Sequence, residues 1–409
     1  MSSQYFCGLD FGSSGARISI INQGKVLLYS SSVKYKYNFT NPNSWILSCS
    51  ELLDSVPQTL KENLLKISIS GTSGTLLACS VNGDCLGEAI PYDEACIGNT
   101  EEISKIAGDN TLLNDPYSSL AKAFKLFESY GENIHLRHQV DWITGWLLKD
   151  WTFGEEGNNI KLGWNLVSES WPKNYNVKKL TKSLPKIIKS GKVLGFIDSG
   201  LAKNLNLNRN ICIISGTTDS NAAFLAAQVK NEEGLTVLGT TTVLKKIITK
   251  PIQGKGITIH RVNDQWVCGG SSNAGGGILS RFFSDNEIEE LSRQINPSNF
   301  TKLDFLPLNS KGERFPVNDP YLEPRIEPRP VSDALYLQGL FEGLARIELK
   351  GWQKIKDLTG TFPTKIVTIG GGSKNPQWRS IREKILKTQI ISCDKTTSYG
   401  SALLALESK

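Results

Sequence analysis

The sequence predicts an α/β protein, and the basis is three glycine-rich turns that each follow a short apolar strand. One turn lies near the N-terminus at residues 8–15, one in the middle at 215–218, and one near the C-terminus at 370–372. Each preceding segment is rich in β-branched or aliphatic residues, and a helix-like segment follows the second and third turns. This alternation is typical of sheets flanked by helices.

Length and composition fit a globular enzyme. With 409 residues the chain is too long for one hydrophobic core, which predicts two or three domains. Its 39% hydrophobic and 21% charged residues are ordinary for such proteins. The first residues contain no basic segment followed by an apolar core, and no apolar run reaches membrane-spanning length. We therefore expect a cytoplasmic protein without a membrane partner.

Cysteine and charge patterns argue against other functions. The eight cysteines include no Cys-x-x-Cys pair and only three histidines are present, so neither zinc nor a redox dithiol is expected. Basic and acidic residues are mostly interleaved, and nucleic acid is not an expected partner. The exception is 173–192, with seven lysines and no acid. We interpret it as a solvated helical face, with a patch that steers anionic ATP as the alternative.

The N-terminal part is expected to open as a meander of strands. Apolar residues predict strands at Tyr5–Leu9, Ala16–Ile21 and Val26–Ser30, separated by glycine turns. Helical spacing of apolar residues then predicts a helix over 44–65, and Ile67–Ser70 alternates like a strand.

Turn and cap residues predict further elements. Asn82-Gly83 is a strong hairpin signal between strands expected at 76–80 and 86–91. Ser118 to Gly131 has the spacing of a helix.

Two helices are predicted in the C-terminal part. A long one should run towards Leu358 with Ser332 or Asp333 as its cap, and another should begin at Pro376. Before both helices, Leu235–Leu238 leads into Gly239–Thr242, which echoes the hydroxyl-rich turn at the N-terminus.

The middle turn places one carboxylate where a helix begins. Asp219 follows Ser215-Gly216-Thr217-Thr218, and helix N-termini favour negative charge. On this segment alone, an N-cap aspartate without further function is the simpler interpretation. The other glycine turns favour a binding site, because bare N–H groups suit phosphate oxygens and a carboxylate can hold a metal ion through water.

At these three turns the sequence resembles the FGGY carbohydrate kinases, which belong to the actin-like ATPase superfamily. The resemblance rests on Gly8–Gly12, Gly216–Asp219 and Gly370–Asn375, and is strongest to a short cyanobacterial and plant branch of ribulose kinase, or xylulose-kinase-like, proteins. It implies two actin-like (ribonuclease H-like) ATPase domains with a cleft between them. The N-terminal, sugar-side domain would span 1–226 with helix 397–409 packing back on it, and the nucleotide-side domain 227–396.

The resemblance also implies site residues. Asp219 would be the catalytic base; Asp10 would assist catalysis, contact the sugar and hold Mg²⁺ through water; and Ser73 would contact the sugar. ATP would be bound by glycine- and hydroxyl-rich turns, namely Gly12, Ser13, Ser14, Gly15, Ala16, Thr240, Gly276, Gly371, Gly372 and Asn375. For Gly276, close packing of a helix on a strand is an equally good interpretation.

The predicted function is ATP-dependent phosphorylation of the 5-hydroxyl of a ketopentose, with D-ribulose as the first candidate substrate. Alternatives are a D-xylulose or glycerol-like polyol kinase, and a non-catalytic sugar- or ATP-sensing protein. The expected partners are ATP, Mg²⁺ and a small sugar, with the chain as monomer or homodimer.

Overall fold

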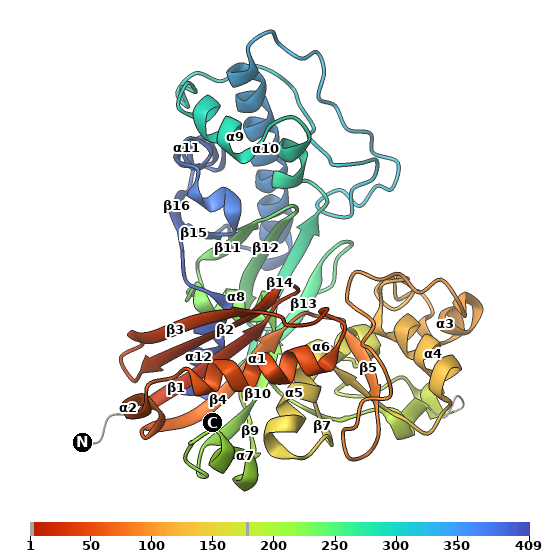
Figure 1. Ribbon diagram of the computed structural model, residues 1–409. Coiled ribbons are helices and arrows are strands. Elements are labelled where there is room, and N and C mark those ends of the chain that lie inside the picture. Colours follow the sequence, from red (N-terminus) through yellow and green to blue (C-terminus); the bar gives the residue numbers. More distant parts are fainter. Residues whose placement is uncertain (1–3, 177–179) are drawn as a thin grey trace. The chain divides into compact units, whose positions relative to one another are not determined.

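The computed structural model describes residues 4–176 and 180–409, and the contacts divide the chain into two units (Figure 1). The first unit consists of residues 1–226, 261–264 and 395–409, and the second of residues 227–260 and 265–394. Each unit is built around a six-stranded sheet.

The sheet of the first unit has three parallel strands at its centre. Its strand order is β3-β2-β1-β4-β10-β9. β4 pairs in parallel with both β1 and β10, whereas β2, β3 and β9 join antiparallel. The carboxyl ends of the three parallel strands therefore meet at one edge of the sheet. The strands are β1 (Tyr5–Phe11), β2 (Gly15–Asn22), β3 (Leu27–Lys34), β4 (Leu64–Gly71), β9 (Val193–Phe196) and β10 (Cys212–Thr218).

Helices cover both faces of this sheet. One face packs against α1 (Pro42–Asp54) and α5 (Gln139–Leu148), and the other against α8 (Asp219–Ala226) and α12 (Thr397–Glu407). Side chains alternate along the strands, so each face has its own core. The first core includes Leu9, Ile18, Trp45, Leu52, Ile69 and Ile143, and the second includes Phe6, Ile21, Ile214, Tyr399 and Ala402.

The helix predicted over 44–65 is wrong in its extent. α1 ends at Asp54, and a short α2 (Gln58–Lys61) begins after Pro57, before β4. Proline lacks an N–H group and its ring blocks the preceding helical turn, which explains the break at this position.

Smaller elements of the first unit lie between β4 and β9. The predicted hairpin exists only in part, because β5 (Leu76–Cys79) forms while residues 86–91 make isolated bridges instead of a strand. The helix predicted from Ser118 is confirmed as α4, with the Ser118 side chain as its N-cap. The elements are α3 (Thr100–Ala107), α4 (Ser119–Tyr130), β6 (His135–His138), β7 (Phe153–Glu155), α6 (Glu156–Asn159), β8 (Lys186–Ile188) and α7 (Ser199–Asn204).

The lysine-rich stretch is not the helical face that its composition suggested. Residues 173–176 and 180–183 form single 3₁₀ turns, and Lys186–Ile188 is the strand β8. Residues 177–179 of this stretch lie outside the described residues.

The second unit has a mixed sheet with the order β13-β14-β12-β11-β15-β16. β11 pairs antiparallel with β12 and parallel with β15, so it occupies a central position like that of β1 in the first sheet. The strands are β11 (Gly234–Leu238), β12 (Thr242–Ile248), β13 (Thr258–Val262), β14 (Gln265–Ser272), β15 (Lys365–Ile369) and β16 (Gln389–Ser392).

Helices of the second unit begin as their cap residues predicted. The 27-residue α10 (Asp333–Thr359) starts at the Ser332 N-cap, whose hydroxyl accepts a hydrogen bond from the Leu335 N–H. α11 (Pro376–Leu386) has Pro376 in its first position. A further helix, α9 (Asp285–Ser292), is capped reciprocally by Ser284 and Glu287.

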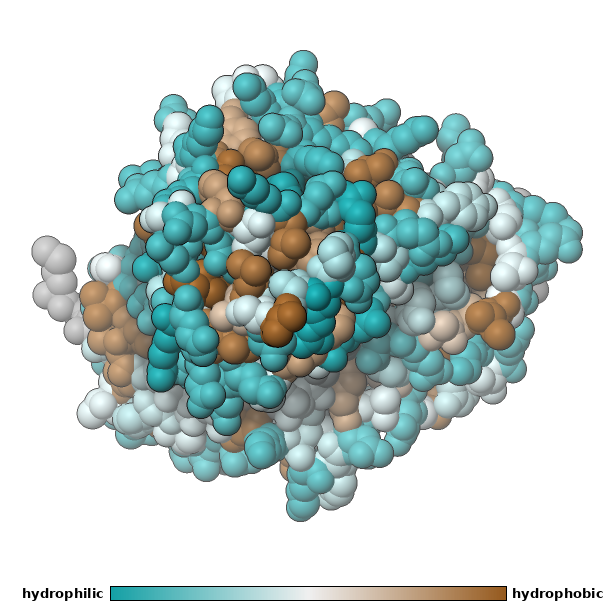
Figure 2. Space-filling model, turned by 90° about the horizontal axis from the view of Figure 1, so that it is seen from above, coloured by the Kyte–Doolittle hydropathy of each residue, from teal (hydrophilic) through white to brown (hydrophobic). Residues whose placement is uncertain are grey.

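The described surface shows no sign of a membrane segment. Among residues 4–176 and 180–409, no helix combines the length and the hydropathy needed to cross a bilayer. On the face drawn in Figure 2, hydrophobic residues form small groups between hydrophilic ones.

Candidate functional site

Asp10 lies near the carboxyl end of β1, in the middle of the first sheet. In the parallel register it stands opposite Ser70 of β4, and the next pair is Phe11 with Gly71. Ligands of α/β sheets commonly bind outside the carboxyl ends of parallel strands. This edge is therefore the natural place for a site in the first unit.

Asp219 reaches the same edge from β10. Thr217 and Thr218 pair with Ser70 and Gly71, and Asp219 is the next residue after the strand. Two strand spacings separate β1 from β10, which corresponds to about 10 Å. The register of one sheet thus brings the Asp10 and Asp219 backbones within about the breadth of a small sugar.

The carboxylate of Asp10 is buried and held by hydroxyl groups. Ser70 Oγ donates to Oδ1 at 2.8 Å and Thr397 Oγ1 donates to Oδ2. Only 5% of Asp10 is exposed, and burial raises its pKa above the ordinary value, while the two hydroxyls and the charge of Arg17 oppose the rise. The hydrogen bonds fix the orientation of the carboxylate.

The turn after Asp10 presents its backbone to solvent. The Gly12 N–H donates to the Gly15 carbonyl at 3.0 Å, and the side chains of Ser13 and Ser14 are exposed. A Cβ on Gly15 would lie 2.2 Å from the Val33 carbonyl oxygen, so only glycine fits there. Ala16 is buried at the start of β2.

The loop after β4 holds Ser73 in a defined place. Thr72 donates from both its N–H and its hydroxyl to Gln139 Oε1, at 3.0 and 2.8 Å. Lys161 Nζ donates to the Ser73 carbonyl at 3.1 Å, and Gly74 takes a φ of +98°. Ser73 is half-buried, directly beyond the strand that pairs with Asp10.

Asp219 is not the N-cap of the helix that it begins. The Thr218 hydroxyl takes that position, because it accepts a hydrogen bond from the Asn221 N–H at 3.3 Å. One oxygen of the half-buried Asp219 carboxylate accepts from the N–H of Ser220 at 2.6 Å. The purely structural capping role is therefore taken by its neighbour.

A buried polar cluster supports the start of α8, and sequence reasoning missed it. The Glu155 N–H donates to Asp141 Oδ1 at 2.8 Å, and Asn159 Nδ2 donates to Oδ2 at 3.0 Å. Glu155 Oε2 accepts from the Asn158 N–H at 2.8 Å, and its buried Oε1 has no hydrogen-bond partner among the residues that the structure describes. A Cβ on Gly157 would lie 3.4 Å from Asn221, which places this cluster beside α8. The available signal was the run of polar residues 155–159 between Gly154 and Ile160.

Burial raises the pKa of Glu155 well above its ordinary value, and the adjacent Glu156 and Asp141 act in the same direction. A raised folded-state pKa means that the folded chain holds this proton more tightly than the unfolded chain. The contribution to stability is therefore present at low pH and is lost as pH rises through the folded pKa.

Glu155→Gln imitates the protonated carboxyl, so the variant is expected to lose less folding stability than the wild type as pH rises. The denaturant midpoint of the variant should fall less than that of the wild type between about pH 5 and about pH 8. Glu88→Gln, at an exposed carboxylate, serves as the control and should keep the wild-type pH profile. An equal fall in Glu155→Gln and wild type would contradict the assignment.

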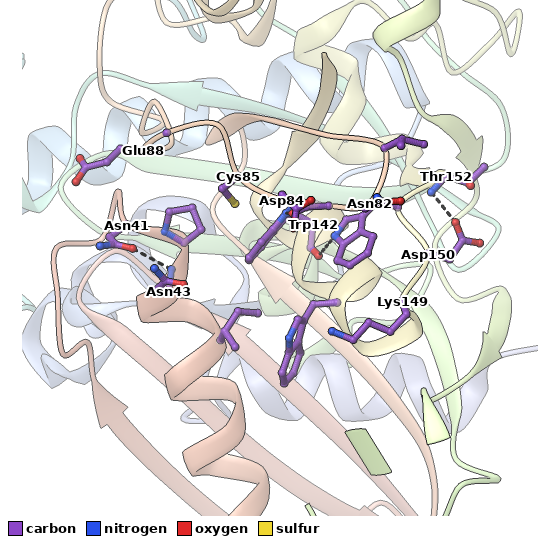
Figure 3. Close-up of a pocket in the computed structure, with 17 residues that line it drawn as sticks. Asn41, Asn43, Asn82, Asp84, Cys85, Glu88, Trp142, Lys149, Asp150 and Thr152 are labelled. Atoms are coloured by element: carbon purple, nitrogen blue, oxygen red, sulfur yellow. Dashed lines mark hydrogen bonds between the residues drawn. The ribbon is translucent and has the colours of Figure 1, made fainter. Parts of the chain in front are cut away.

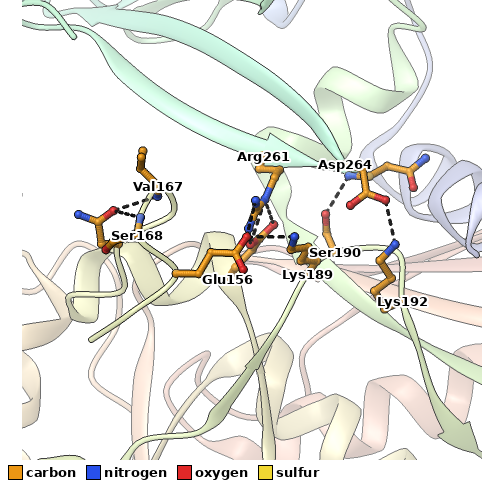
Figure 4. A network of polar contacts seen from close by, with 11 residues as sticks. Glu156, Val167, Ser168, Lys189, Ser190, Lys192, Arg261 and Asp264 are labelled. Atoms are coloured by element: carbon orange, nitrogen blue, oxygen red, sulfur yellow. Dashed lines mark hydrogen bonds and ion pairs between the residues drawn. The ribbon is translucent and has the colours of Figure 1, made fainter. Parts of the chain in front are cut away.

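A buried ion pair lies on the neighbouring α6 (Figure 4). The Arg261 guanidinium donates to both oxygens of Glu156, with its shortest contact at 2.5 Å, and to Glu169 at 2.8 Å. Lys189 also pairs with Glu169 at 3.0 Å. Arg261 thus fixes the segment 261–264 within the first unit, a connection that sequence spacing could not reveal.

In the second unit the turn between β11 and β12 resembles that between β1 and β2. The Gly239 N–H donates to the Thr241 carbonyl at 3.1 Å, and Thr240 is exposed at the tip. The glycine-rich loop after β14 docks on this turn, because Gly276 N–H donates to the Gly239 carbonyl at 2.8 Å and Gly277 N–H to the Thr240 carbonyl at 3.1 Å. Gly276 thus packs against a turn, and its expected contact with the nucleotide stays a prediction.

These loops enclose a pocket of about 300 Å³ within the second unit. The Asn375 side chain shapes it by accepting from the Trp378 N–H at 2.9 Å and donating to Ser292 at 2.7 Å. The pocket thus collects all five residues that were expected to bind nucleotide from this half of the chain. They are Thr240, Gly276, Gly371, Gly372 and Asn375, with Leu238, Ile288 and Trp378 as apolar lining.

Gly371→Val is expected to weaken ATP binding at least about tenfold, which corresponds to about 1.4 kcal/mol. A Cβ at Gly371 meets no protein atom within 4 Å, so the added side chain starts in open space at the wall of the pocket. Titration calorimetry with ATP measures the effect. Gly98→Val, at the other open glycine without a positive φ, is the matched control and should bind ATP like the wild type. Equal affinity of Gly371→Val and wild type would place the nucleotide elsewhere.

A larger pocket of about 1040 Å³ lies in the first unit and was not predicted (Figure 3). It is bordered by α1, the hairpin around Asn82 and the end of α5, where Lys149 lies over the rings of Trp146 and Trp151. Trp151 is 9% exposed and its indole N–H donates to the Trp142 carbonyl, so it packs against its neighbours. None of the predicted site residues lines this pocket.

Comparison with solved structures decides the fold. A kinase from Brucella ovis, described as a xyloylose kinase, superimposes with a TM-score of 0.85 at 18% identity, covering 98% of this chain and 90% of that chain. Glycerol kinase from Plasmodium falciparum with ADP superimposes with a TM-score of 0.83 at 16% identity. The match covers 99% of this chain and 90% of that chain. The chain has the FGGY carbohydrate kinase fold. The prediction of an α/β protein with two actin-like ATPase domains is thereby confirmed.

Curated sequences point in the same direction as the FGGY fold. Xylulose kinase of Staphylococcus xylosus is 22% identical over 437 residues, covering 98% of this chain and 90% of that protein. Autoinducer-2 kinase of Salmonella typhimurium is 21% identical, and the match covers 99% of this chain and 86% of that protein. No family model matches the chain. The chain is thus similar over almost its whole length to proteins named as kinases, while membership of the FGGY family and of its ribulose kinase branch stays a prediction.

Proposed function

We propose that this protein is an ATP-dependent sugar kinase that phosphorylates the 5-hydroxyl of a ketopentose, with D-ribulose as the first candidate. The observation that carries the proposal is the meeting of Asp10 and Asp219 at one edge of the sheet, with Ser73 in the loop that follows β4, the strand between them. The whole-length relatives named as kinases support the class of reaction.

Asp219 acts as the base in this proposal. A sugar hydroxyl is a poor nucleophile, and phosphoryl transfer depends chiefly on positioning and charge neutralisation. The Asp219 carboxylate accepts the hydroxyl proton, and its bond from the Ser220 N–H holds it at the helix start. Because Thr218 caps the helix, the Asp219 side chain is not needed for that task.

Ser73 and Asp10 complete the sugar side. The Ser73 hydroxyl can both donate to and accept from a polyol. Ser70 and Thr397 aim the Asp10 carboxylate, which orients the sugar from the opposite side of the strand end.

Asp10 also fits the metal that kinases use. Mg²⁺ keeps most of its waters and is commonly held by one or two carboxylates together with substrate phosphates. The buried Asp10 carboxylate, oriented by Ser70 and Thr397, would hold the ion through water. When bound, Mg²⁺ would neutralise charge on the transferred phosphoryl group.

Backbone groups bind ATP in this proposal. The N–H groups of residues 13–16 bind phosphate oxygens from a turn whose tip, Ser13 and Ser14, is exposed, and Thr240 lies at the exposed tip of a second turn of the same kind. The pocket beside Gly371 and Gly372 receives the adenosine, since glycine lets a flat ring approach the backbone closely.

Two other functions make different predictions. A non-catalytic sugar or ATP sensor has no need of a base, and the presence of both carboxylates disfavours it. A polyol kinase of the glycerol type shares every feature of the site except the acceptor.

D-xylulose is the second candidate substrate, and the curated xylulose kinases favour it. The two ketopentoses differ in the orientation of one hydroxyl group. Measuring ADP release with D-ribulose, D-xylulose and glycerol tests the proposal. We expect the highest kcat/KM with D-ribulose; a higher value with D-xylulose or glycerol transfers the assignment to that substrate, and the absence of sugar-dependent ADP release with all three rejects it.

A further inference from the structure

Cys79 and Cys85 face each other across the hairpin after the Ser73 loop. They form an antiparallel bridge, with Cys79 at the end of β5. Two backbone hydrogen bonds flank the pair, from Ser80 N–H to the Asp84 carbonyl at 2.9 Å and from Leu86 N–H to the Ala78 carbonyl at 3.0 Å. This pattern defines a non-hydrogen-bonded pair, the closer of the two kinds of antiparallel pair.

That register suits a disulfide. Residues in such a pair have Cα atoms about 4.5 Å apart, within the range of about 4.4–6.8 Å that disulfides require. The turn between the two cysteines is also stabilised, because the Ser80 hydroxyl accepts hydrogen bonds from the Asn82 and Asp84 N–H groups at 3.2 and 3.1 Å. The backbone of the hairpin therefore permits the bond, and Cys79 Sγ has only to leave its contact with the His135 carbonyl at 3.6 Å.

Access is unequal between the two thiols. Cys85 is half-buried and lines the 1040 Å³ pocket, where Figure 3 shows its sulfur. Cys79 is fully buried behind it. A small oxidant can thus reach Cys85 first, and Cys79 is in place to resolve the product.

We propose that Cys79 and Cys85 form a reversible thiol–disulfide pair, both being free thiols in the structure. With an organic disulfide such as glutathione disulfide, the Cys85 thiolate attacks one sulfur and releases one thiol. The Cys79 thiolate then attacks Cys85 Sγ and releases the second thiol. One external disulfide is reduced to two thiols, two cysteine protons are transferred to the leaving thiolates or to solvent, and one S–S bond forms in the protein.

Burial sets the expected rate. It raises the pKa of Cys85 to about 12 and that of Cys79 to about 11, and the neighbouring Cys79 thiol contributes to the rise at Cys85. The thiolate is the reacting species, so oxidation should be slow near neutral pH and become faster as pH rises.

The buried pair Cys7 and Cys49 gives an internal control. These thiols, on β1 and α1, are close enough for Cys49 to raise the pKa of Cys7, but both have zero exposure. Neither lines the pocket that reaches Cys85. Access, rather than proximity alone, should therefore decide which pair oxidises.

The test oxidises the folded full-length chain with glutathione disulfide, quenches in acid and alkylates the remaining thiols. Cleavage before aspartate separates the three nearby cysteines, because Cys79 falls in 54–83, Cys85 in 84–92 and Cys96 in 93–108. We expect fragments 54–83 and 84–92 to be linked, with the link lost after a thiol reductant and formed faster at higher pH. Cys7 and Cys49 should remain alkylated thiols.

Two variants sharpen the result. Cys96→Ser should leave the link intact, and Cys85→Ser should leave Cys79 as a thiol. Unlinked thiols in the wild type, a stable glutathione adduct on Cys85 without a link, or a link from Cys85 to Cys96 would each overturn the proposal. Circular dichroism of the oxidised chain checks that it is still folded, and linkage seen only in unfolded chain also overturns it.

Discussion

Asp219→Asn is expected to reduce sugar-dependent turnover by about 10²–10⁴-fold, the usual contribution of a positioned general base. Asparagine keeps the size of the side chain and an oxygen for the Ser220 N–H, but it cannot take up the hydroxyl proton. Since Thr218 caps α8, the helix start should survive the substitution. A coupled assay of ADP release measures turnover, and titration calorimetry should show that the affinity for ATP is unchanged.

A matched aspartate separates catalysis from helix capping. Asp198 caps α7 through a hydrogen bond from the Leu201 N–H at 2.9 Å, and Asp198→Asn alters a helix-start carboxylate away from the sheet edge. This control should retain wild-type turnover. If Asp219→Asn retained it as well, Asp219 would not be the base.

Asp10→Asn is expected to weaken Mg²⁺-dependent activity by about 10–100-fold, the usual cost of losing a group that holds a metal ion through an intermediate ligand. Activity measured against Mg²⁺ concentration should show a higher requirement in the variant. Asp54→Asn removes an exposed carboxylate of the same unit and should leave the requirement unchanged.

The pH dependence of Asp10 has a definite sign. Burial raises its pKa, and the ionised form is the one that binds Mg²⁺. Wild-type activity should therefore fall as pH decreases through the raised pKa, and the Asp10→Asn variant should lack this fall. If the Asp10→Asn variant had a normal Mg²⁺ requirement and lost activity at low pH as the wild type does, Asp10 would not hold the ion.

Local signals in the sequence predicted much of the fold. Ser118, Ser332 and Pro376 mark helix starts because a cap or a fixed φ acts within one turn of the chain. Pro57 is an equally local signal, and the helix predicted across it was wrong for that reason. The helical face predicted for the lysine-rich stretch was wrong for another reason, since a run of like charges says little about backbone conformation.

The site was predictable only where its residues follow strands. Asp10, Ser73 and Asp219 each lie at or just beyond a strand end, so their approach follows from sheet register. The Arg261–Glu156 pair joins residues far apart in sequence, and the Glu155 cluster depends on burial. The ion pair has no local signal in the sequence, and the polar run around Glu155 does not reveal that it is buried.

The central claim is that Asp219 receives the proton of the sugar hydroxyl at the edge shared by β1, β4 and β10. A crystal structure of the chain with D-ribulose and a non-hydrolysable ATP analogue tests it most directly. The account predicts the 5-hydroxyl within hydrogen-bond reach of the Asp219 carboxylate, about 2.6–3.2 Å. A sugar bound in the pocket beside Trp146, or one whose 5-hydroxyl lies out of reach of Asp219, would contradict it.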